Sequence, residues 1–204
     1  MPGVMKKRSP TLIKPPLSWN MAGAPVAPPA IPVLAERGGT QLKSPLATIV
    51  VDTREQNPFD FSRFAGWFAG VEEKALQLGD YSVAGLEDVC VVERKDLSDL
   101  IRSLTVERAV FVKRLKRMSS YAHRLLVITT ALSQVKSRYP HCAADPNRIF
   151  QSLIALLAGL NVPFLCTENQ LLGEEAVASY LYQVHLYHWL EKNDFGRCLA
   201  DDDL

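Results

Sequence analysis

The sequence has 204 residues, of which 48% are hydrophobic and 22% are charged, and its formal net charge at pH 7 is +1. This length and composition are typical of one globular domain with its own core, and they exclude a collagen-like or wholly disordered chain. No run of about eighteen uninterrupted apolar residues is present, so the sequence predicts no membrane-spanning helix and no membrane partner.

Residues 1–45 differ in composition from the rest of the chain. They hold nine of the 13 prolines, and six basic residues against one acid give them a net charge of +5, whereas residues 46–204 carry −4. Proline lacks a backbone donor and restricts the residue before it. We therefore expect a disordered, Pro-rich basic arm over 1–45, either a solvated linker or a nucleic-acid contact, followed by one domain over 46–204.

From residue 46 onward the apolar pattern predicts strands that alternate with helices. The expected strands are 47–51, 71–78, 81–84, 88–95, 124–129 and 162–166. The expected helices are 61–69, 97–118 with a break near Thr105, 146–160 and 173–191. Asp145 followed by Pro146 is a strong start signal for the third of these helices. This order of elements predicts an α/β fold in which a mixed sheet lies between helices.

A run of charged residues ends the strand expected at 88–95. Residues two apart in a strand share a face, so Glu93 and Lys95 are expected to project together while Arg94 points the other way. An ordinary surface ion pair explains Glu93 and Lys95 equally well, and such a pair stabilises a fold by only about 0–1 kcal/mol.

Gly79-Asp80 favours a chemical role for this strand end. A hairpin that joins the two strands would fold Asp80 back beside Glu93. Two carboxylates in one place repel each other unless a cation lies between them, and hard oxygen ligands suit Mg²⁺ or Mn²⁺ better than zinc. With Lys95 next to it, such a site has the groups needed for metal-assisted hydrolysis of a phosphodiester.

These residues resemble a known signature. Gly79-Asp80 followed by Glu93-Arg94-Lys95-Asp96-Leu97-Ser98-Asp99 is similar to the GD…ERK…D motif of the XPF/Hef-type structure-specific DNA endonucleases. Val51-Asp52-Thr53-Arg54-Glu55 resembles the D-x-R-E strand end that precedes the motif in that family. The resemblance covers roughly residues 47–130 clearly and the remainder by element order.

The resemblance implies a restriction-endonuclease-like fold and roles for individual residues. Asp80 and Glu93 would ligate a divalent metal together with the backbone carbonyl of Arg94, Lys95 would be the catalytic lysine, and Asp52 would supply a further carboxylate. The implied supporting residues are Arg54, Glu55, Arg94 and Asp99. From the residues alone, Arg94 could instead simply pair with Asp99 or Glu55.

The sequence also departs from the family pattern. Thr129-Thr130 stand where relatives often carry an acid at the end of the next strand, so it stays open whether the site binds one metal ion or two. Val112 stands where a glutamine is common. We expect no tandem helix-hairpin-helix domain of the kind that many relatives use to bind DNA. We therefore expect DNA geometry to be recognised by the nuclease domain, the arm or another, targeting protein.

Basic residues are concentrated after the ERK strand. Between residues 102 and 124 there are seven of them against one acid. This pattern is typical of a phosphate-contacting track and equally of a solvated helix face. The residues expected to bind DNA are Arg102, Arg108, Lys113, Arg114, Lys116 and Arg117.

The last expected helix carries an apolar stripe at Val177, Leu181, Val184 and Trp189. The resemblance implies a homodimer formed through the nuclease domain, and the stripe could serve such an interface or face the core. His185 and His188 are three residues apart, but surface or interface histidines explain them better than a metal site does.

These patterns predict an endodeoxyribonuclease that uses Mg²⁺, or Mn²⁺ in its place, to cut branched or otherwise irregular DNA. A non-catalytic DNA-binding or scaffold member of the same fold is the main alternative. An unrelated α/β enzyme has no supporting motif in the sequence. Four widely spaced cysteines and the absence of a secretory signal pattern predict an intracellular location: cytoplasm, nucleoid or, in a eukaryote, nucleus.

Overall fold

A computed structural model describes residues 26, 33–35, 41–140 and 142–193. The strands are β1 Val33–Ala35, β2 Gln41–Lys43, β3 Ala47–Asp52, β4 Phe68–Lys74, β5 Tyr81–Val83, β6 Cys90–Lys95, β7 His123–Ile128 and β8 Phe164–Cys166. The helices are α1 Leu97–Leu104, α2 Arg108–Met118, α3 Leu132–Val135, α4 Pro146–Leu160 and α5 Gln170–Lys192, with a 3₁₀ turn at Ser62–Phe64. None of the helices in the described part of the chain is long and apolar enough to cross a membrane.

Six strands form one mixed sheet in the order β4-β3-β5-β6-β7-β8. β3 and β4 are parallel, β5 is antiparallel to both β3 and β6, and β6, β7 and β8 are parallel to one another. The mixed α/β sheet predicted from the sequence is therefore confirmed. The β5–β6 hairpin lies at the centre of the sheet.

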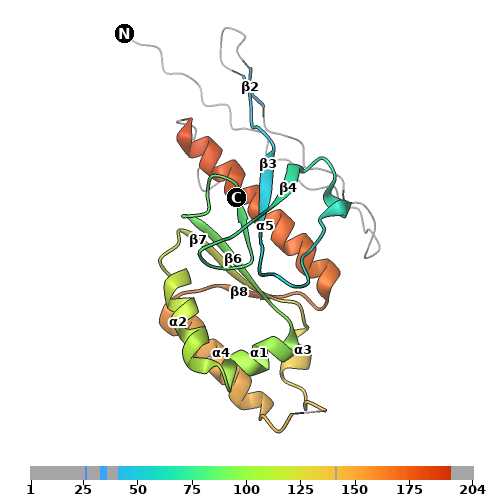
Figure 1. Ribbon diagram of the computed structural model, residues 1–204, viewed down its shortest axis with the longest axis vertical. Helices are drawn as coiled ribbons and strands as arrows, with labels where there is room; N and C mark the ends of the chain where they lie inside the picture. Colours follow the sequence, from blue (N-terminus) through green and yellow to red (C-terminus); the bar gives the residue numbers. More distant parts are fainter. Residues whose placement is uncertain (1–25, 27–32, 36–40, 141, 194–204) are drawn as a thin grey trace.

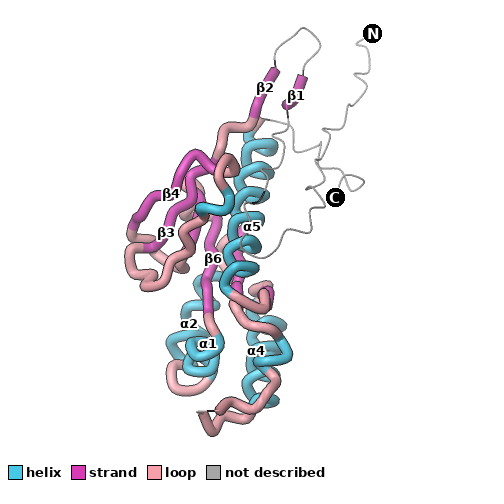
Figure 2. The backbone as a smooth tube through the Cα atoms, turned by 90° about the vertical axis from the view of Figure 1, so that its right-hand side faces the viewer, coloured by secondary structure: helices cyan, strands magenta, loops and turns pink. Residues whose placement is uncertain are grey.

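Helices cover the two faces of the sheet at different places (Figures 1 and 2). α5 runs lengthwise beside the sheet, while α1, α2 and α4 gather together at the lower end of the molecule in both views. Each layer has its own core: Val177 and Leu181 of α5 are buried with β3 and β5, and Leu115 of α2 and Leu153 of α4 are buried against β6 and β7. The stripe on the last helix thus belongs to the core of the single chain.

Strand β6 belongs to both cores because its side chains alternate. Val92 packs in the α5 layer, and Val91 packs in the layer of α1, α2 and α4. Both side chains are fully buried. The charged residues that follow them in the strand continue the same alternation.

The helix starts that local signals predicted are confirmed. The Asp96 side chain accepts a hydrogen bond from the Asp99 N–H and caps α1 directly after β6. The Asp145 side chain accepts from the Asn147 N–H and caps α4, which has Pro146 in its first turn. The break predicted near Thr105 separates α1 from α2.

The helix predicted over 61–69 is wrong. Only the 3₁₀ turn forms there, and the strand β4 begins at Phe68, three residues before the predicted strand start. Phe61 has a left-handed backbone (φ 56°), and its N–H donates a 2.8 Å hydrogen bond to Glu174 of α5. Phe61, Phe64 and Trp67 are buried at a spacing of three residues, but a bent segment that packs under α5 buries them.

Three further elements were not predicted. α3 is a single turn, and the strands β1 and β2 pair antiparallel within the segment expected to be an arm. The prolines before residue 33 concealed this pair, although Gly38-Gly39 between the strands is a turn signal. Within that segment, residues 1–25, 27–32 and 36–40 lie outside the described residues.

Candidate active site

The end of β6 presents charges to both faces of the sheet. The Lys95 Nζ atom lies 2.9 Å from Glu93 Oε1 on the side of α1 and α2. Arg94 points to the α5 side, where its Nη2 atom donates a 2.8 Å hydrogen bond to Glu55 Oε1 and its guanidinium lies over the Phe59 ring. Of the two partners considered for Arg94, the structure selects Glu55, and the Glu93–Lys95 pair is largely buried.

Glu93 is an unusual residue for the interior of a domain. Its side chain is fully buried. Its Oε1 atom forms ion pairs both with Lys95 Nζ and, at 2.6 Å, with Arg114 Nη1 of α2. Its Oε2 atom has no hydrogen-bond partner among the described residues. Because an unpartnered buried carboxylate oxygen is costly, this atom marks a place where a ligand is expected.

Gly79 brings Asp80 to the same place. The glycine has a positive φ of 78°, and a Cβ there would lie 2.4 Å from Val91 Cγ2 and 2.8 Å from Val92 O. Only glycine permits this close approach. The Asp80 N–H donates to Val92 O, and Asp80 Oδ2 accepts a 2.6 Å hydrogen bond from the Arg94 N–H, so the acid lies against the strand that carries Glu93.

The protonation of Asp80 reflects this crowding. Burial and then the negative charge of Glu93 raise its pKa to about 7, and the hydrogen bond from the Arg94 N–H opposes the rise only in part. A cation beside the two carboxylates would remove the repulsion. The donor set therefore fits a hard dication: two carboxylates, one with a free buried oxygen.

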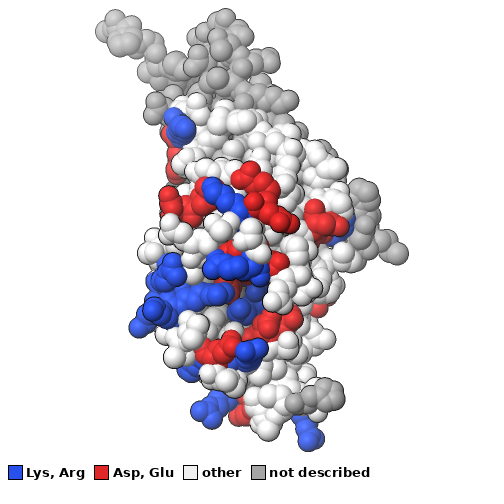
Figure 3. All heavy atoms as spheres, viewed as in Figure 1, with Lys and Arg blue, Asp and Glu red and all other residues white. Residues whose placement is uncertain are grey.

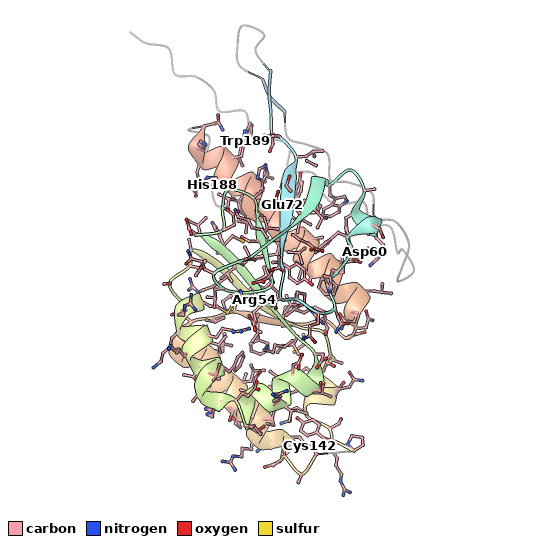
Figure 4. The ribbon with its side chains drawn as sticks, in the orientation of Figure 1. Arg54, Asp60, Glu72, Cys142, His188 and Trp189 are labelled. Atoms are coloured by element: carbon pink, nitrogen blue, oxygen red, sulfur yellow. The ribbon has the colours of Figure 1, made fainter. Side chains whose placement is uncertain are left out.

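Asp52 lies next to Asp80, and its backbone N–H donates a 2.9 Å hydrogen bond to the Asp80 carbonyl oxygen. It is buried at the end of β3, and Arg54 holds it by hydrogen bonds from its backbone N–H and Nε to Oδ1 and from Nη2 to Oδ2. The hydrogen bonds from Arg54 lower the pKa of Asp52. The Arg54 side chain is 68% exposed and, in the view of Figure 4, lies between the sheet and the layer of α1 and α2.

Among the described residues, no three His, Cys, Asp or Glu side chains are grouped so that they alone could hold a metal ion. Mg²⁺ is commonly held by one or two carboxylates, with waters and substrate phosphates completing its shell. Asp99 lies exposed in the first turn of α1, and its N–H donates to the Asp96 side chain that caps this helix. His185 Nε2 lies 2.9 Å from the Pro45 carbonyl oxygen.

The basic residues predicted to contact DNA separate into two groups. Arg108, Lys113 and Lys116 are exposed and form no ion pair with any described residue. Arg102 pairs with Glu107 at 2.6 Å, and Arg117 donates to the Gln77 carbonyl at 3.1 Å. Figure 3 shows basic side chains gathered on the surface where Figure 1 places α2.

The contact between Arg114 and Glu93 is not predicted by the sequence. Arg114 is one of the residues expected to bind DNA, and in the structure its guanidinium also reaches Glu93. The negative charges of Glu93 and Asp80 raise the pKa of Arg114, which places it in the field of both acids. Helical spacing is a signal for this contact, because residues three apart lie on the same face of a helix. Arg114 lies three residues after Phe111, which is buried and whose ring faces Lys95.

Comparison with known proteins agrees with this architecture. A family model described as the ERCC4 domain matches residues 51–183, which is more than half of the chain. The structure of XPF from Aeropyrum pernix is similar with a TM-score of 0.53 and 19% identity, over 72% of this chain and 69% of that one. XPF from Aeropyrum pernix in complex with DNA is similar with a TM-score of 0.53 and 20% identity, over 69% of this chain and 65% of that one. No curated protein matches the sequence.

Proposed function

The chain belongs to the ERCC4-domain, XPF-type family, and from that premise we propose that it is a metal-dependent endonuclease that hydrolyses DNA at branched or irregular structures. The observation that carries the proposal is the fully buried Glu93, which has two cations on one oxygen and no partner on the other, beside an acid whose pKa is raised to about 7. A purely structural ion pair has no need of the second acid or of the unpartnered oxygen.

Asp80 and Glu93 are the residues that would hold the cation, and Mg²⁺ is the ion that suits them best, with Mn²⁺ as a substitute. The carbonyl of Arg94 is the further ligand that the family implies. When bound, such a cation supplies Lewis acidity at the scissile phosphate and balances the charge that develops there.

The remaining groups of the site have roles that follow from their charge and place. Lys95 would place its ammonium beside the attacking water and the phosphate oxygens. Arg54 holds Asp52 ionised at the edge of the site and has exposed guanidinium surface for a phosphate. In the reaction, the water oxygen bonds to phosphorus while the bond to the 3′ oxygen breaks, which leaves a 5′-phosphate and a 3′-hydroxyl.

DNA is the partner that fits the surface next to the site. The exposed residues Arg108, Lys113 and Lys116 would contact the phosphate backbone, which fixes position without reading sequence. One of the similar structures is described as a complex with DNA, which supports this part of the proposal. A homodimer formed through the nuclease domain remains part of the proposal, with an interface other than the stripe on α5.

The test is a cleavage assay on flap, fork, four-way junction and plain duplex DNA with Mg²⁺ or Mn²⁺, using the parent chain and the variants Asp80→Asn and Lys95→Ala. Lys192→Ala, an exposed lysine on α5 far along the chain, is the matched control. We expect branched substrates to be cut by the parent and the control, and both site variants to lose at least a hundredfold in rate. Site variants that cut at the parental rate would refute the proposal, and a parent that binds forks without cutting would support a scaffold role.

A further inference from the structure

We propose that Arg114 is a positioning residue that orients the Glu93 carboxylate toward the metal. This inference rests on the proposed function and names a residue through which the site is built. Arg114 Nη1 and Lys95 Nζ both contact Oε1 of Glu93, at 2.6 Å and 2.9 Å, while Oε2 has no partner among the described residues. Two cations on one oxygen fix the rotation of the carboxylate and leave the other oxygen for a ligand.

Helix α2 holds Arg114 in a fixed place. Phe111, Leu115 and Met118 on the same helix are at most 3% exposed and anchor it in the core against β6 and β7. The ring of Phe111 lies 5.7 Å from Lys95 Nζ, so one turn of α2 faces both the lysine and the glutamate. The anchored helix carries Arg114, whereas Lys95 comes from the strand itself, so two separate elements hold the same carboxylate oxygen.

The contact is better suited to orientation than to charge balance. If Arg114 is removed, Lys95 still faces the buried carboxylate, so Glu93 keeps one cationic partner. The carboxylate then loses its second fixed contact, so it can rotate and either oxygen can face the metal position. Groups that orient a ligand in this way typically change metal affinity about 10- to 100-fold when they are mutated.

An alternative role for Arg114 is a plain phosphate contact, since its side chain is 42% exposed. The two roles differ in a measurable way. A positioning residue changes metal binding when no DNA is present, and a phosphate contact changes only DNA binding. Arg114→Gln removes the charge at similar length, and Arg114→Lys keeps a cation without the planar fork.

The experiment is calorimetric titration of the metal-free chain with Mn²⁺ alone, on the parent, Arg114→Gln, Arg114→Lys and the control Lys192→Gln, an exposed lysine on α5 that forms no ion pair with a described residue. We expect Arg114→Gln to bind Mn²⁺ at least tenfold more weakly, Arg114→Lys to recover most of that loss, and Lys192→Gln to bind as the parent does. Circular dichroism melting of the same samples separates a folding defect from a binding defect.

Two results would overturn the inference, and they differ from each other. If the parent binds Mn²⁺ and Arg114→Gln binds it equally well, Arg114 does not position the ligand, and the proposed function stands. If the parent itself binds no Mn²⁺, the proposed function fails and the inference fails with it. A loss of affinity that Arg114→Lys recovers would support positioning through the cation at that place.

Discussion

The backbone N–H of Arg94 donates a 2.6 Å hydrogen bond to Oδ2 of Asp80. This bond joins the turn before β5 to the strand β6 beside Glu93, and it uses the main chain, so it does not depend on which side chain occupies position 94. The position of the acid is therefore set by the backbone of the hairpin. The turn at Gly79 makes this hydrogen bond possible.

Substitution of Gly79 by alanine is expected to damage both the fold and the site. Gly79 and Gly85 have nearly the same positive φ, 78° and 80°, but an added Cβ at Gly79 meets Val91 and Val92 whereas at Gly85 it meets nothing within 4 Å. Gly85→Ala should cost about 1 kcal/mol from backbone strain, and Gly79→Ala a further 1–3 kcal/mol from overlap. Urea unfolding of the two variants measures the difference, and equal losses would show that the close approach is not real.

The raised pKa of Asp80 predicts a pH dependence of stability in the metal-free chain. Between the ordinary value of 3.8 and the folded value of about 7, the folded state keeps a proton that the unfolded state has released. The free energy of unfolding should therefore fall as the pH rises through this window and level off above it. Asp80→Asn lacks this titration and keeps an acceptor for the Arg94 N–H.

Thermal melting of the parent and Asp80→Asn at pH 5 and pH 8, in a chelator, checks this. We expect the parent to lose stability relative to the variant as the pH rises, and added Mn²⁺ at pH 8 to restore the parent alone. Melting temperatures that change in parallel in the two proteins would mean that Asp80 titrates normally.

The Glu55–Arg94 ion pair on the α5 side is expected to contribute to folding. Its side chains are only 8% and 7% exposed. Glu55→Gln leaves a buried guanidinium without its counter-charge and should cost about 3 kcal/mol, and adding Arg94→Met should recover part of that loss. Glu107→Gln, from an exposed pair with Arg102, is the control and should change the urea midpoint little. A small effect of Glu55→Gln would mean that water reaches Arg94.

The exposed lysines of α2 are expected to set the salt dependence of DNA binding. Each phosphate contact contributes about 0.9 to the slope of log K against log salt for duplex DNA, so removal of Lys113 and Lys116 together should reduce the slope by about 1.8. Fluorescence anisotropy over a salt series measures this, with Lys192→Ala as the control. An unchanged slope would place the DNA on another face.

The elements that the sequence predicted well depend on local signals. The caps Asp96 and Asp145 and the apolar run before Glu93 each lie next to the element that they define. That Glu93 and Lys95 project from the same face of the sheet follows from the two-residue period of a strand, and no residue far along the chain is needed to predict it. The grouping of Asp80 with this strand required only a short hairpin.

The features that the sequence did not predict depended on distant residues. Phe61, Phe64 and Trp67 have a spacing that suits a helix, but the Phe61 N–H is bound by Glu174, 113 positions along the chain. The contact between Arg114 and Glu93 likewise requires that α2 packs against β6, and the hold of Arg54 on Asp52 is visible only once both side chains are placed. Such long-range packing overrides local periodicity.

A single residue, Asp96, separates the last residue of β6 from the first residue of α1. Because that residue is also the helix cap, the junction has no slack, and one inserted residue there would turn the helix relative to Lys95. The turn at Gly85, which is open to solvent, has no such restriction. Engineered extensions, labels or affinity handles thus belong at the hairpin tip, and the strand–helix junction should keep its natural length.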